Sequence, residues 1–395
     1  MSPRPAPIHL PRSAPARVLA CGAFLKNTAC LVEARQALVS APHGDLSDPR
    51  ACAALETTVA ALVASARGPI DAIAHDLHPD FHSTRVALEW AQRLRVPAIG
   101  IQHHHAHLAV VQAESGIEAS TPFVGLALDG VGLGSDGTAW GGEVLLVRGP
   151  RFERSAHLSP LPLPGGDMAA REPWRLAAAA LHRLGRGDEI VPRFGPLLGE
   201  TPARLLHTML QRGLNCPPSS GAGRWFDAAS AALGLCLRQT TEAEAAIALE
   251  RAATLWLEGR PPAAPADAPG ERTVDGLDLL PLLGRLLDLH EPSNDDIGRA
   301  AAAFHHQLGD ALVHAASLAA RDAGATQVAL GGGCFHNRLL GRHITLGLQA
   351  QGLAVLRPRQ LDCGDAGLAL GQAWAAALRV AATAATPTST ATAES

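Results

Sequence analysis

Short apolar runs and polar turns follow one another along the chain in an order that occurs twice. The first half opens with apolar runs over 18–25 and 29–32, which are separated by a polar turn. The second half opens in the same way, with runs over 123–128 and 142–147 on either side of a longer turn at 129–137. Apolar runs of this length, bounded by turn residues, are typical of strands. The pattern therefore predicts two similar halves that each begin with paired strands.

Each half then closes with two units in which a strand is followed by a helix. In the first half the predicted strands and the helices after them lie over 73–75 and 82–93, then 98–101 and 103–112. In the second half they lie over 328–330 and 335–349, then 353–356 and 367–378. This alternation predicts parallel strands at the centre of each half. Two similar α/β lobes with facing Gly- and Asp-rich turns describe the actin-like, sugar-kinase-like (ASKHA) fold, whose ligands lie beyond the carboxyl ends of the strands.

The same pattern sets the expected domain organisation. It predicts a first lobe, a second lobe and a helical insertion within the second, over 16–120, 121–380 and about 165–320, respectively. Residues 1–15 are rich in Pro, residues 381–395 are rich in Ala, Thr and Ser, and neither segment has apolar periodicity. Both are therefore predicted to be disordered tails. A Pro- and Ala-rich stretch over 260–271 is predicted to be a surface loop.

Composition narrows the class of protein. With 395 residues, of which 47% are hydrophobic and 18% charged, the chain suits two packed lobes with a sizeable core. A formal net charge of -4 argues against a nucleic-acid partner held by bulk electrostatics. Seven scattered cysteines without a CxxC pair fit free thiols in a reducing cytoplasm. The start of the sequence lacks the apolar core of a signal peptide and the apolar runs are too short to span a bilayer, so a soluble cytoplasmic protein is expected.

Four imidazoles occur within five residues directly after a predicted strand, in the sequence QHHHAH over 102–107. His103 and His107 are four residues apart, so on a helix they project from one face and can share one metal ion. His104 with His107, three residues apart, is the alternative pair, and the sequence leaves it open. The competing interpretation is a polar, partly exposed helix start.

A metal needs more ligands than two histidines, and two aspartates are candidates. Asp365 follows the last strand of the second half, at the position equivalent to the histidines of the first half. Asp129 stands in the first turn of the second half, which faces the same predicted cleft. Two imidazoles with carboxylates suit Fe(II), Zn²⁺ or Mn²⁺, with Mg²⁺ as a further alternative, and the ligand set does not decide among them. Taken alone, either aspartate is more often a turn or helix-cap residue.

Three glycine-bearing turns are candidate phosphate cradles, because glycine lets backbone N–H groups approach an anion and a following helix adds its positive end. They lie over 129–137, 219–223 and 331–333. None matches GxxxxGK[ST] or GxGxxG in the required context, so each alone is equally an ordinary tight turn. Together they favour a nucleotide or phosphoester ligand. The glycine-bearing turn over 129–137 also supplies Gly130 and Asp136 as candidate contacts.

Three further polar residues have both a functional and an ordinary interpretation. Lys26 and Asn27 occupy the polar turn between the first two apolar runs of the first half, the position from which an actin-like lobe contacts phosphate. A Lys in a hairpin, however, is usually just solvated. Asp227 lies on an otherwise apolar helix, in the sequence WFDAA. It is either a helix-surface residue or an acceptor for a ribose hydroxyl.

Several short motifs occur in a fixed order along the chain. They are HDLHPD at 75–80, QHHHAH at 102–107, LDG at 128–130, WGGE at 140–143, PGGD at 164–167, REPW at 171–174, LGGG at 330–333 with Asn337, and ALGQA at 369–373. Over residues 17–378 the chain therefore resembles the C-terminal half of HypF-type carbamoyltransferases. A more distant similarity extends to tRNA threonylcarbamoyl-transferring enzymes and to O-carbamoyltransferases of antibiotic synthesis.

The resemblance implies a concrete activity. HypF-type proteins make a carbamoyl adenylate from carbamoyl phosphate and ATP. They pass the carbamoyl group to the C-terminal cysteine of HypE, which is the first step towards the cyanide ligands of [NiFe]-hydrogenase. The metal-binding HxxxH pair and the Asp of a DxGxA segment in the related enzymes match His103, His107 and Asp365. In the carbamoyltransferase branch the position of Asp129 supplies a further ligand.

The resemblance also implies a site for ATP or AMP. The positions that contact the nucleotide match Asp227, Asn337 and the glycines before Asn337, which are Gly331, Gly332 and Gly333. One segment departs from the family, because Thr-Glu-Ala-Glu over 241–244 stands where Tyr-Glu-Gly-Gln is usual. There Glu244 is the candidate contact near the ribose, and the usual glycine is lost.

A second departure concerns the donor. Full-length HypF proteins carry an acylphosphatase-like domain, CxxC zinc motifs and an adenylate-forming domain ahead of this region, and their motifs do not occur in this sequence. The expectation is either a chain that receives carbamoyl adenylate from elsewhere or a shortened variant that works differently. The resemblance implies that the nucleophile is the thiolate of the partner, and the lack of a GxSxG signature in the chain is consistent with this. His104 or His105 is a candidate base for that thiol.

Two other functions compete with carbamoyl transfer. The first is a tRNA threonylcarbamoyl transferase-like enzyme, which the acidic net charge and the PGGD and REPW segments disfavour. The second is a non-catalytic scaffold that binds nucleotide and docks a maturation partner. The HxxxH pair with its aspartates disfavours the scaffold, because a scaffold has no need of a metal.

Overall fold

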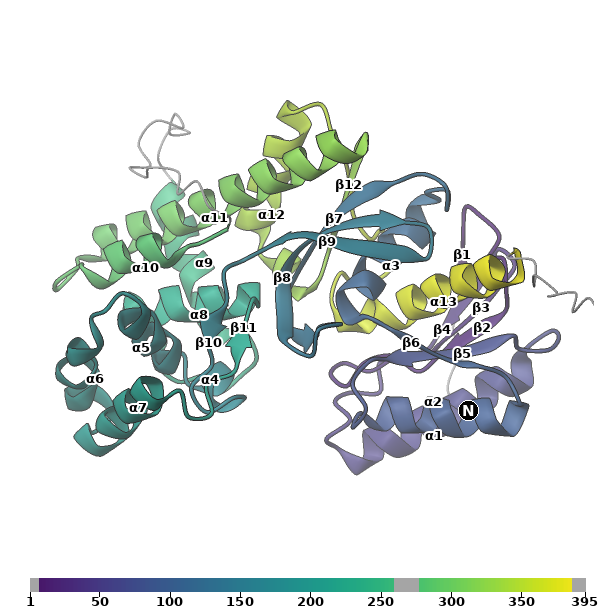
Figure 1. Cartoon of the computed structure of the whole chain (residues 1–395), viewed down its shortest axis with the longest axis horizontal. Coiled ribbons are helices and arrows are strands. Elements are labelled where there is room, and N and C mark those ends of the chain that lie inside the picture. Colours follow the sequence, from purple (N-terminus) through teal and green to yellow (C-terminus); the bar gives the residue numbers. More distant parts are fainter. Residues whose placement is uncertain (1–6, 259–276, 386–395) are drawn as a thin grey trace, which may run out of the picture. The chain divides into compact units, whose positions relative to one another are not determined.

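A computed structural model of the chain describes residues 7–258 and 277–385 (Figure 1). Two compact units contain these residues. Unit 1 comprises the chain up to Phe123, Val147–Glu153 and the chain from Leu356 onwards. Unit 2 comprises Val124–Leu146 and Arg154–Val355.

A six-stranded sheet lies at the centre of unit 1, in the order β1-β4-β3-β2-β5-β6. Its strands are β1 (Ile8–His9), β2 (Val18–Ala20), β3 (Cys30–Glu33), β4 (Gln36–Val39), β5 (Ala72–Asp76) and β6 (Ala98–Ile101). The first four form antiparallel pairs, whereas β5 pairs in parallel with β2 and β6 pairs in parallel with β5.

Helices cover both faces of this sheet (Figure 1). They are α1 (Pro49–Ser65), α2 (His82–Leu94), α3 (His103–Ser115) and α13 (Leu368–Ala385). Leu19 and Ile73 pack with α1 and α2, whereas their neighbours Val18 and Ala74 pack with α3 and α13. Successive residues of a strand point to opposite faces, so short all-apolar strands serve two separate cores.

Unit 2 contains most of the second sheet, in the order β10-β11-β8-β7-β12-β13, with β9 also paired to β8. Its main strands are β7 (Phe123–Leu133), β8 (Ala139–Arg148), β9 (Arg151–His157), β12 (Gln327–Gly331) and β13 (Ala354–Leu356). β12 pairs in parallel with β7, so that Gly331 lies opposite Ala127. The strands of the two sheets lie side by side in the same order relative to their order in the chain. β4-β3-β2-β5-β6 of the first sheet corresponds to β9-β8-β7-β12-β13 of the second. This duplication confirms the expected pair of similar ASKHA-type α/β lobes.

Between β9 and β12 the described chain is mainly helical. The helices are α4 (Met168–Arg171), α5 (Trp174–Arg183), α6 (Ile190–Leu198), α7 (Glu200–Arg212), α8 (Ala222–Ala232), α9 (Glu244–Leu257), α10 (Leu280–Leu287) and α11 (Asn294–Ala323). Two short strands, β10 (Leu161–Pro162) and β11 (Pro218–Ser219), extend the sheet, and α12 (Arg338–Ala350) follows β12. The longest helix, α11, begins with a capping box in which Ser293 and Asp296 satisfy each other's backbone N–H groups.

The predicted N-terminal tail is wrong for residues 7–15. Ile8 and His9 form β1 at the sheet edge against β4, and Leu10 and Ala14 are buried. An edge strand tolerates the neighbouring prolines because one side needs no hydrogen bonds. Residues 1–6, the predicted loop at 260–271 and most of the predicted C-terminal tail lie outside the described residues. The first residues of that tail, 381–385, continue α13.

The C-terminal helix α13 belongs to unit 1, whereas the sequence pattern assigned residues up to 380 to the second lobe. The physical reason is burial, since α13 packs against α3, β2 and β5. The segment Asp365–Ala385 is also the one described helix that is long and apolar enough to cross a membrane. Most of it is buried in unit 1, as is usual for a core helix of this composition.

Asp129 also differs from expectation, because it lies within β7 rather than in a turn.

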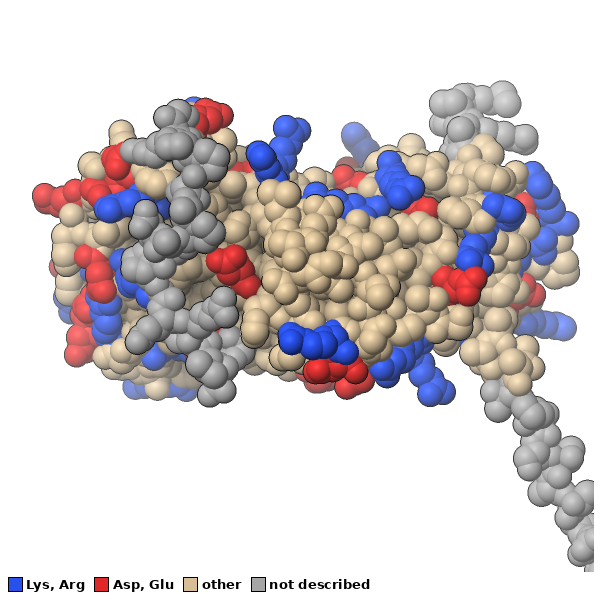
Figure 2. Space-filling view, turned by 90° about the horizontal axis from the view of Figure 1, so that it is seen from above, with Lys and Arg blue, Asp and Glu red and all other residues tan. Residues whose placement is uncertain are grey.

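On the face drawn in Figure 2, the Lys and Arg side chains of the described residues are interspersed with Asp and Glu. Charges of both signs in one region weaken the long-range attraction of a polyanion. The expected absence of a nucleic-acid partner stays a prediction.

Helices α3 and α13 of unit 1 cross at close range. A Cβ atom added at Gly371 would lie 1.8 Å from the backbone oxygen of Ala106. Nothing larger than hydrogen fits there, because the obstructing atom belongs to the helix backbone and cannot rotate away. Ala106 lies between His103 and His107, so the glycine lets α13 approach the helix turn that carries both histidines.

We expect Gly371→Ala to destabilise unit 1 by about 3 kcal/mol or more, at the upper end of overpacking effects. Thermal or urea unfolding measures the loss. The matched control is Gly284→Ala on α10, where the added Cβ would make only an ordinary 3.5 Å contact with a Leu184 side chain. That control should be neutral or stabilising by up to about 1 kcal/mol, because Ala favours helix over Gly. Equal stability of both variants would contradict the crossing as described.

Candidate functional site

The histidine pair lies at the start of α3. The side chain of Gln102 caps the helix by accepting a hydrogen bond from the N–H of His105 at 2.8 Å. The helix therefore begins at His103, and His107 lies one turn later on the same face. Both side chains are buried, with 6% and 1% of their surface exposed.

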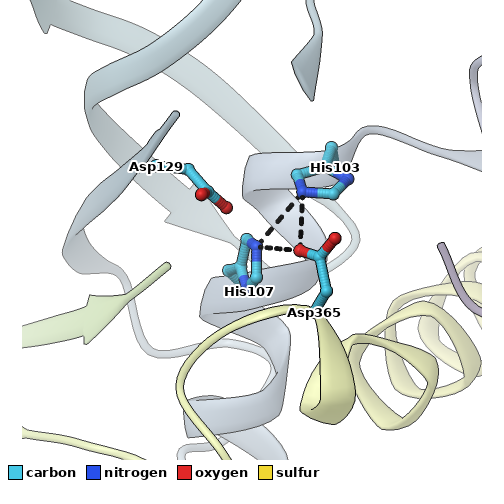
Figure 3. A group of neighbouring side chains, drawn as sticks. All are labelled: His103, His107, Asp129 and Asp365. Carbon is cyan, nitrogen blue, oxygen red and sulfur yellow. Dashed lines mark hydrogen bonds and ion pairs between the residues drawn. The ribbon is translucent and has the colours of Figure 1, made fainter. Parts of the chain in front are cut away.

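Asp365 faces the pair from the short turn that precedes α13 (Figure 3). The Nε2 atoms of His103 and His107 are 3.2 Å apart. The Oδ1 atom of Asp365 lies 3.3 Å from the first and 3.5 Å from the second. Three atoms from two segments of chain thus form a nearly equilateral triangle inside unit 1.

The size of this triangle fits a metal ion. Ligands bound at about 2.0–2.1 Å in a tetrahedral site stand roughly 3.3–3.5 Å from one another. Two imidazole nitrogens and one carboxylate oxygen suit Zn²⁺ or Fe(II). The residues present therefore fit the expected ion. The alternative histidine, His104, is not among the residues whose ligand atoms gather here, and its Nδ1 lies 2.9 Å from Nε2 of Gln102.

The far end of α3 holds the segment that leads to Asp365. The buried carboxylate of Glu114 accepts hydrogen bonds from three consecutive backbone N–H groups, those of Arg359, Gln360 and Leu361. A carboxylate with several N–H donors is a rigid anchor, because charge-assisted bonds are about twice as strong as neutral ones. Sequence analysis missed Glu114, which gives no local signal.

The fourth predicted ligand, Asp129, belongs to unit 2. Its Oδ1 accepts a hydrogen bond from the N–H of Gly130 at 2.8 Å. Figure 3 draws it with the other three residues, but its part in the ligand set stays a prediction.

Several predicted nucleotide residues are neighbours within unit 2. Gly332 has a φ of 102°, and a Cβ there would lie 2.2 Å from the oxygen of Leu128, so only glycine fits at this crossing of β12 and β7. The positions of Gly333 and Gly130 approach the side chains of Asp129 and Arg224, respectively, at 3.3 and 3.2 Å from an added Cβ. The backbone at these glycines thus lies close to the carboxylate of Asp129 and the guanidinium of Arg224.

Asp227 is buried on α8 and connects to this region through Arg224. Its Oδ2 lies 3.1 Å from Nη2 of Arg224, and its Oδ1 accepts a hydrogen bond from Gln239 at 3.2 Å. Burial raises the pKa of Asp227 to about 6, although Arg224 and Gln239 oppose the shift. The structure thus excludes the helix-surface alternative for Asp227. Arg224 escaped sequence analysis, although its place just after the glycines of 219–223 was an available signal.

The side chains of two other predicted nucleotide contacts, Asn337 and Glu244, form hydrogen bonds at the N-termini of helices. Asn337 caps α12 by accepting from the N–H of Leu340 at 2.9 Å, and its amide nitrogen lies 2.9 Å from Nε2 of His305. Glu244 accepts from the N–H and hydroxyl of Thr240 at the start of α9. Hydrogen bonding lowers the pKa of Glu244, so it is ionised at neutral pH. Contact of either residue with a ligand stays a prediction.

The two candidates in the polar turn of the first half, Lys26 and Asn27, differ in exposure. Lys26 is exposed, whereas Asn27 is buried and its amide nitrogen donates to the oxygens of Cys21 and Ala23. His43 lies 2.8 Å from the amide oxygen of Asn27. This geometry gives Asn27 a structural role in holding the turn.

Asp136 is hydrogen-bonded within the protein, and the two histidines outside the triad, His104 and His105, are buried. Asp136 accepts hydrogen bonds from Thr138 and Trp140, which outweigh the effect of burial and lower its pKa. His104 and His105 are completely buried. Burial lowers the pKa of His105 to about 3, so it stays neutral, and neither ring is accessible to a protein thiol. The expectation that one of them is the base is therefore not supported.

Fold and site together define the class of protein: a two-lobed ASKHA-type chain with a triad of candidate metal ligands in one lobe. Two family models match it, the HypF Kae1-like domain over residues 13–114 and the second subdomain of the Kae1-like domain of carbamoyltransferases over 125–372. The chain belongs to the HypF carbamoyltransferase family.

The similarity to individual proteins is extensive. A carbamoyltransferase HypF homolog of Cupriavidus necator is 54% identical over 366 residues, which cover 92% of both chains. Carbamoyltransferase HypF2 of the same organism is 46% identical and covers 95% of this chain. Full-length HypF, solved in a phosphate- and nucleotide-bound form, covers 94% of this chain at 29% identity and a TM-score of 0.80. The chain spans about half the length of the last two proteins.

For the metal triad we expect His103→Ala and His107→Ala each to abolish stoichiometric metal, because each removes one of the only two imidazole ligands of the predicted set. Elemental analysis of purified, folded protein measures the content. His314→Ala, an exposed residue on α11, is the control and should keep its metal. Full retention in both single variants would refute the assignment, and loss in His104→Ala but not in His103→Ala would favour the alternative pair.

For Asp227 we expect a pH-dependent stability cost. Because its pKa is raised, the folded state holds the proton more tightly than the unfolded state, so stability falls as pH rises from about 3.8 to about 6. Above pH 6 the cost is at most about 3 kcal/mol. Asp227→Asn should therefore raise the unfolding temperature at pH 8 but not at pH 4, while weakening nucleotide binding in calorimetry.

The exposed Asp296 is the control for this effect. Hydrogen bonds from Ser293 lower its pKa, so Asp296→Asn should reduce stability at pH 8, the opposite sign. An Asp227→Asn variant that is less stable than the parent at pH 8 would show that the carboxylate is not buried at a cost.

Proposed function

We propose that this chain transfers a carbamoyl group from carbamoyl adenylate to the C-terminal cysteine of a HypE-like partner, for the cyanide ligands of [NiFe]-hydrogenase. Membership of the HypF family, together with the intact triad of His103, His107 and Asp365, carries the proposal. The carbamoyl donor derives from carbamoyl phosphate and ATP. The free cysteines and the absence of a bulk basic charge support a cytoplasmic protein that does not bind nucleic acid.

The reaction needs no covalent intermediate on this chain. The partner's thiolate attacks the carbamoyl carbon, an S–C bond forms, and the bond from that carbon to the phosphate oxygen breaks. AMP leaves with the electron pair, and the thiol proton is lost to a base or to solvent. A bound divalent ion supplies positive charge that stabilises the phosphate of the leaving AMP.

The chain's own residues bind and orient the donor. In the proposal ATP or AMP lies along Gly331, Gly332 and Gly333, because glycine lets backbone N–H groups approach a phosphate. Asp227 accepts from a ribose hydroxyl, and Arg224 keeps its carboxylate ionised at neutral pH. The solved HypF relative in a nucleotide-bound form supports a nucleotide site in this family.

A base for the thiol must be accessible. His75 and His78 meet this requirement better than His104 and His105, since both are partly exposed near the carboxyl end of β5. Asp76 between them is hydrogen-bonded to the triad residue His103. This contact brings the end of β5, which carries His75, and the loop after it, which carries His78, close to the candidate metal ligands.

The test is intact-mass spectrometry of the partner. Supplied with preformed carbamoyl adenylate, the chain should raise the partner's mass by one carbamoyl group, and His103→Ala should block the gain. The exposed-residue variant His314→Ala should transfer as the parent does. A partner whose C-terminal Cys is replaced by Ser tests the acceptor and should show no gain.

A parallel reaction with carbamoyl phosphate and ATP alone tests whether the chain makes its own donor, and we expect slow transfer or none. If neither donor modifies the partner while calorimetry still shows nucleotide binding, the scaffold function replaces this proposal. Modification of tRNA instead of the partner would favour the threonylcarbamoyl transferase-like alternative.

A further inference from the structure

Asp76 is a buried carboxylate next to the metal triad that no role assigned so far uses. It is the last residue of β5 and only 1% of its surface is exposed. Its Oδ2 lies 2.9 Å from Nδ1 of His103. Its Oδ1 accepts a hydrogen bond from the N–H of His78 at 3.0 Å.

The contact with His103 determines which ring nitrogen carries the proton. An ionised carboxylate can only accept a hydrogen bond, so Nδ1 of His103 must donate and bear the hydrogen. In a neutral imidazole the other nitrogen, Nε2, then has a lone pair. This is the nitrogen that points at His107 and Asp365 in the triad. The hydrogen-bond network thus presents the ring in the tautomer that can bind a metal.

Sheet register brings Asp76 to this position. β5 and β6 run in parallel, and Asp76 lies opposite Ile101, the last residue of β6. The chain then passes through Gln102 directly into His103 at the start of α3. Because both strands end at the same edge, the carboxylate meets the first helical histidine without any flexible connection between them.

The second oxygen of Asp76 orders the loop that follows β5. Asp76 accepts from the N–H of His78, and the hydroxyl of Thr84 donates to the backbone oxygen of the same residue at 2.9 Å. The His78 ring stacks on Phe81 with centroids 4.2 Å apart and planes inclined by 3°. One carboxylate therefore fixes both a metal-ligand ring and the adjacent loop, which makes its own position well determined.

We propose that Asp76 is a positioning residue that holds His103 in the Nδ1–H tautomer and so sets the metal affinity of the triad. The inference rests on the metal site of the proposed function. Partners of metal-binding histidines of this kind typically change metal affinity by about 10- to 100-fold when they are replaced. The expected loss on replacing Asp76 lies in that range.

Asp76→Asn is the sharpest variant because it keeps the size and the acceptor for the N–H of His78. Its amide NH₂ would face Nδ1 of His103 and favour the opposite tautomer, with the hydrogen on Nε2. Zn²⁺ affinity, measured by competition with a chromogenic chelator, should fall about 10- to 100-fold. The control is Glu33→Gln, another buried carboxylate of unit 1, which pairs with Arg17. It should leave the Zn²⁺ affinity unchanged.

The tautomer itself gives a second measurement that needs no metal. Long-range ¹⁵N NMR of the metal-free protein, assigned with the His103→Ala variant, should show Nδ1–H in the parent and Nε2–H in Asp76→Asn. A parent protein with Nε2–H at His103, or a Zn²⁺ affinity in folded Asp76→Asn within twofold of the parent, would overturn the proposal. If Asp76→Asn does not fold, the parent's tautomer alone decides.

These outcomes separate this inference from the proposed function. Failure of carbamoyl transfer with normal Zn²⁺ binding leaves the role of Asp76 supported and removes only the activity. A parent protein that binds no Zn²⁺ removes the metal site and this inference with it.

Discussion

The triad depends on one steric constraint, the contact of Gly371 on α13 with the backbone of Ala106 on α3. Two of the ligands flank Ala106, and the third lies just before α13 begins. Helix axes normally stay 8–10 Å apart because side chains separate them, and a glycine at the crossing removes that separation. The distances of 3.2–3.5 Å among the three ligand atoms thus follow from how closely two buried helices can pack.

Buried carboxylates then fix what packing alone leaves adjustable. Glu114 holds the segment before Asp365, and Asp76 holds the ring of His103. A buried carboxylate is costly unless its oxygens are satisfied, and both residues use two oxygens for several donors. Asp227 in unit 2 differs, because its raised pKa shows a burial cost that its two partners do not cancel. Such residual cost is typical of groups retained for a ligand rather than for stability.

The sequence predicts what depends on local periodicity and fails where distant residues decide. The strand-helix alternation and the spacing of His103 and His107 are local, so the paired lobes and the histidine face follow from them. Asp76 and Glu114 act on residues 27 and 245 or more positions away, and nothing near either of them signals this. The tail at 7–15 was misjudged because overall proline content conceals two side chains, Leu10 and Ala14, that fill the core.

The departure at 241–244 is smaller in three dimensions than in sequence. Ala243 has a φ of 59° and a ψ of 16°, the left-handed conformation that a glycine adopts without strain. An alanine there costs about 1 kcal/mol or more. The carboxylate of Glu244 offsets part of this cost, because it accepts from the N–H groups of Thr240 and Thr241 and so closes the turn. The turn thus has the backbone that glycine favours, and the substitution changes which side chains line it rather than the path of the chain.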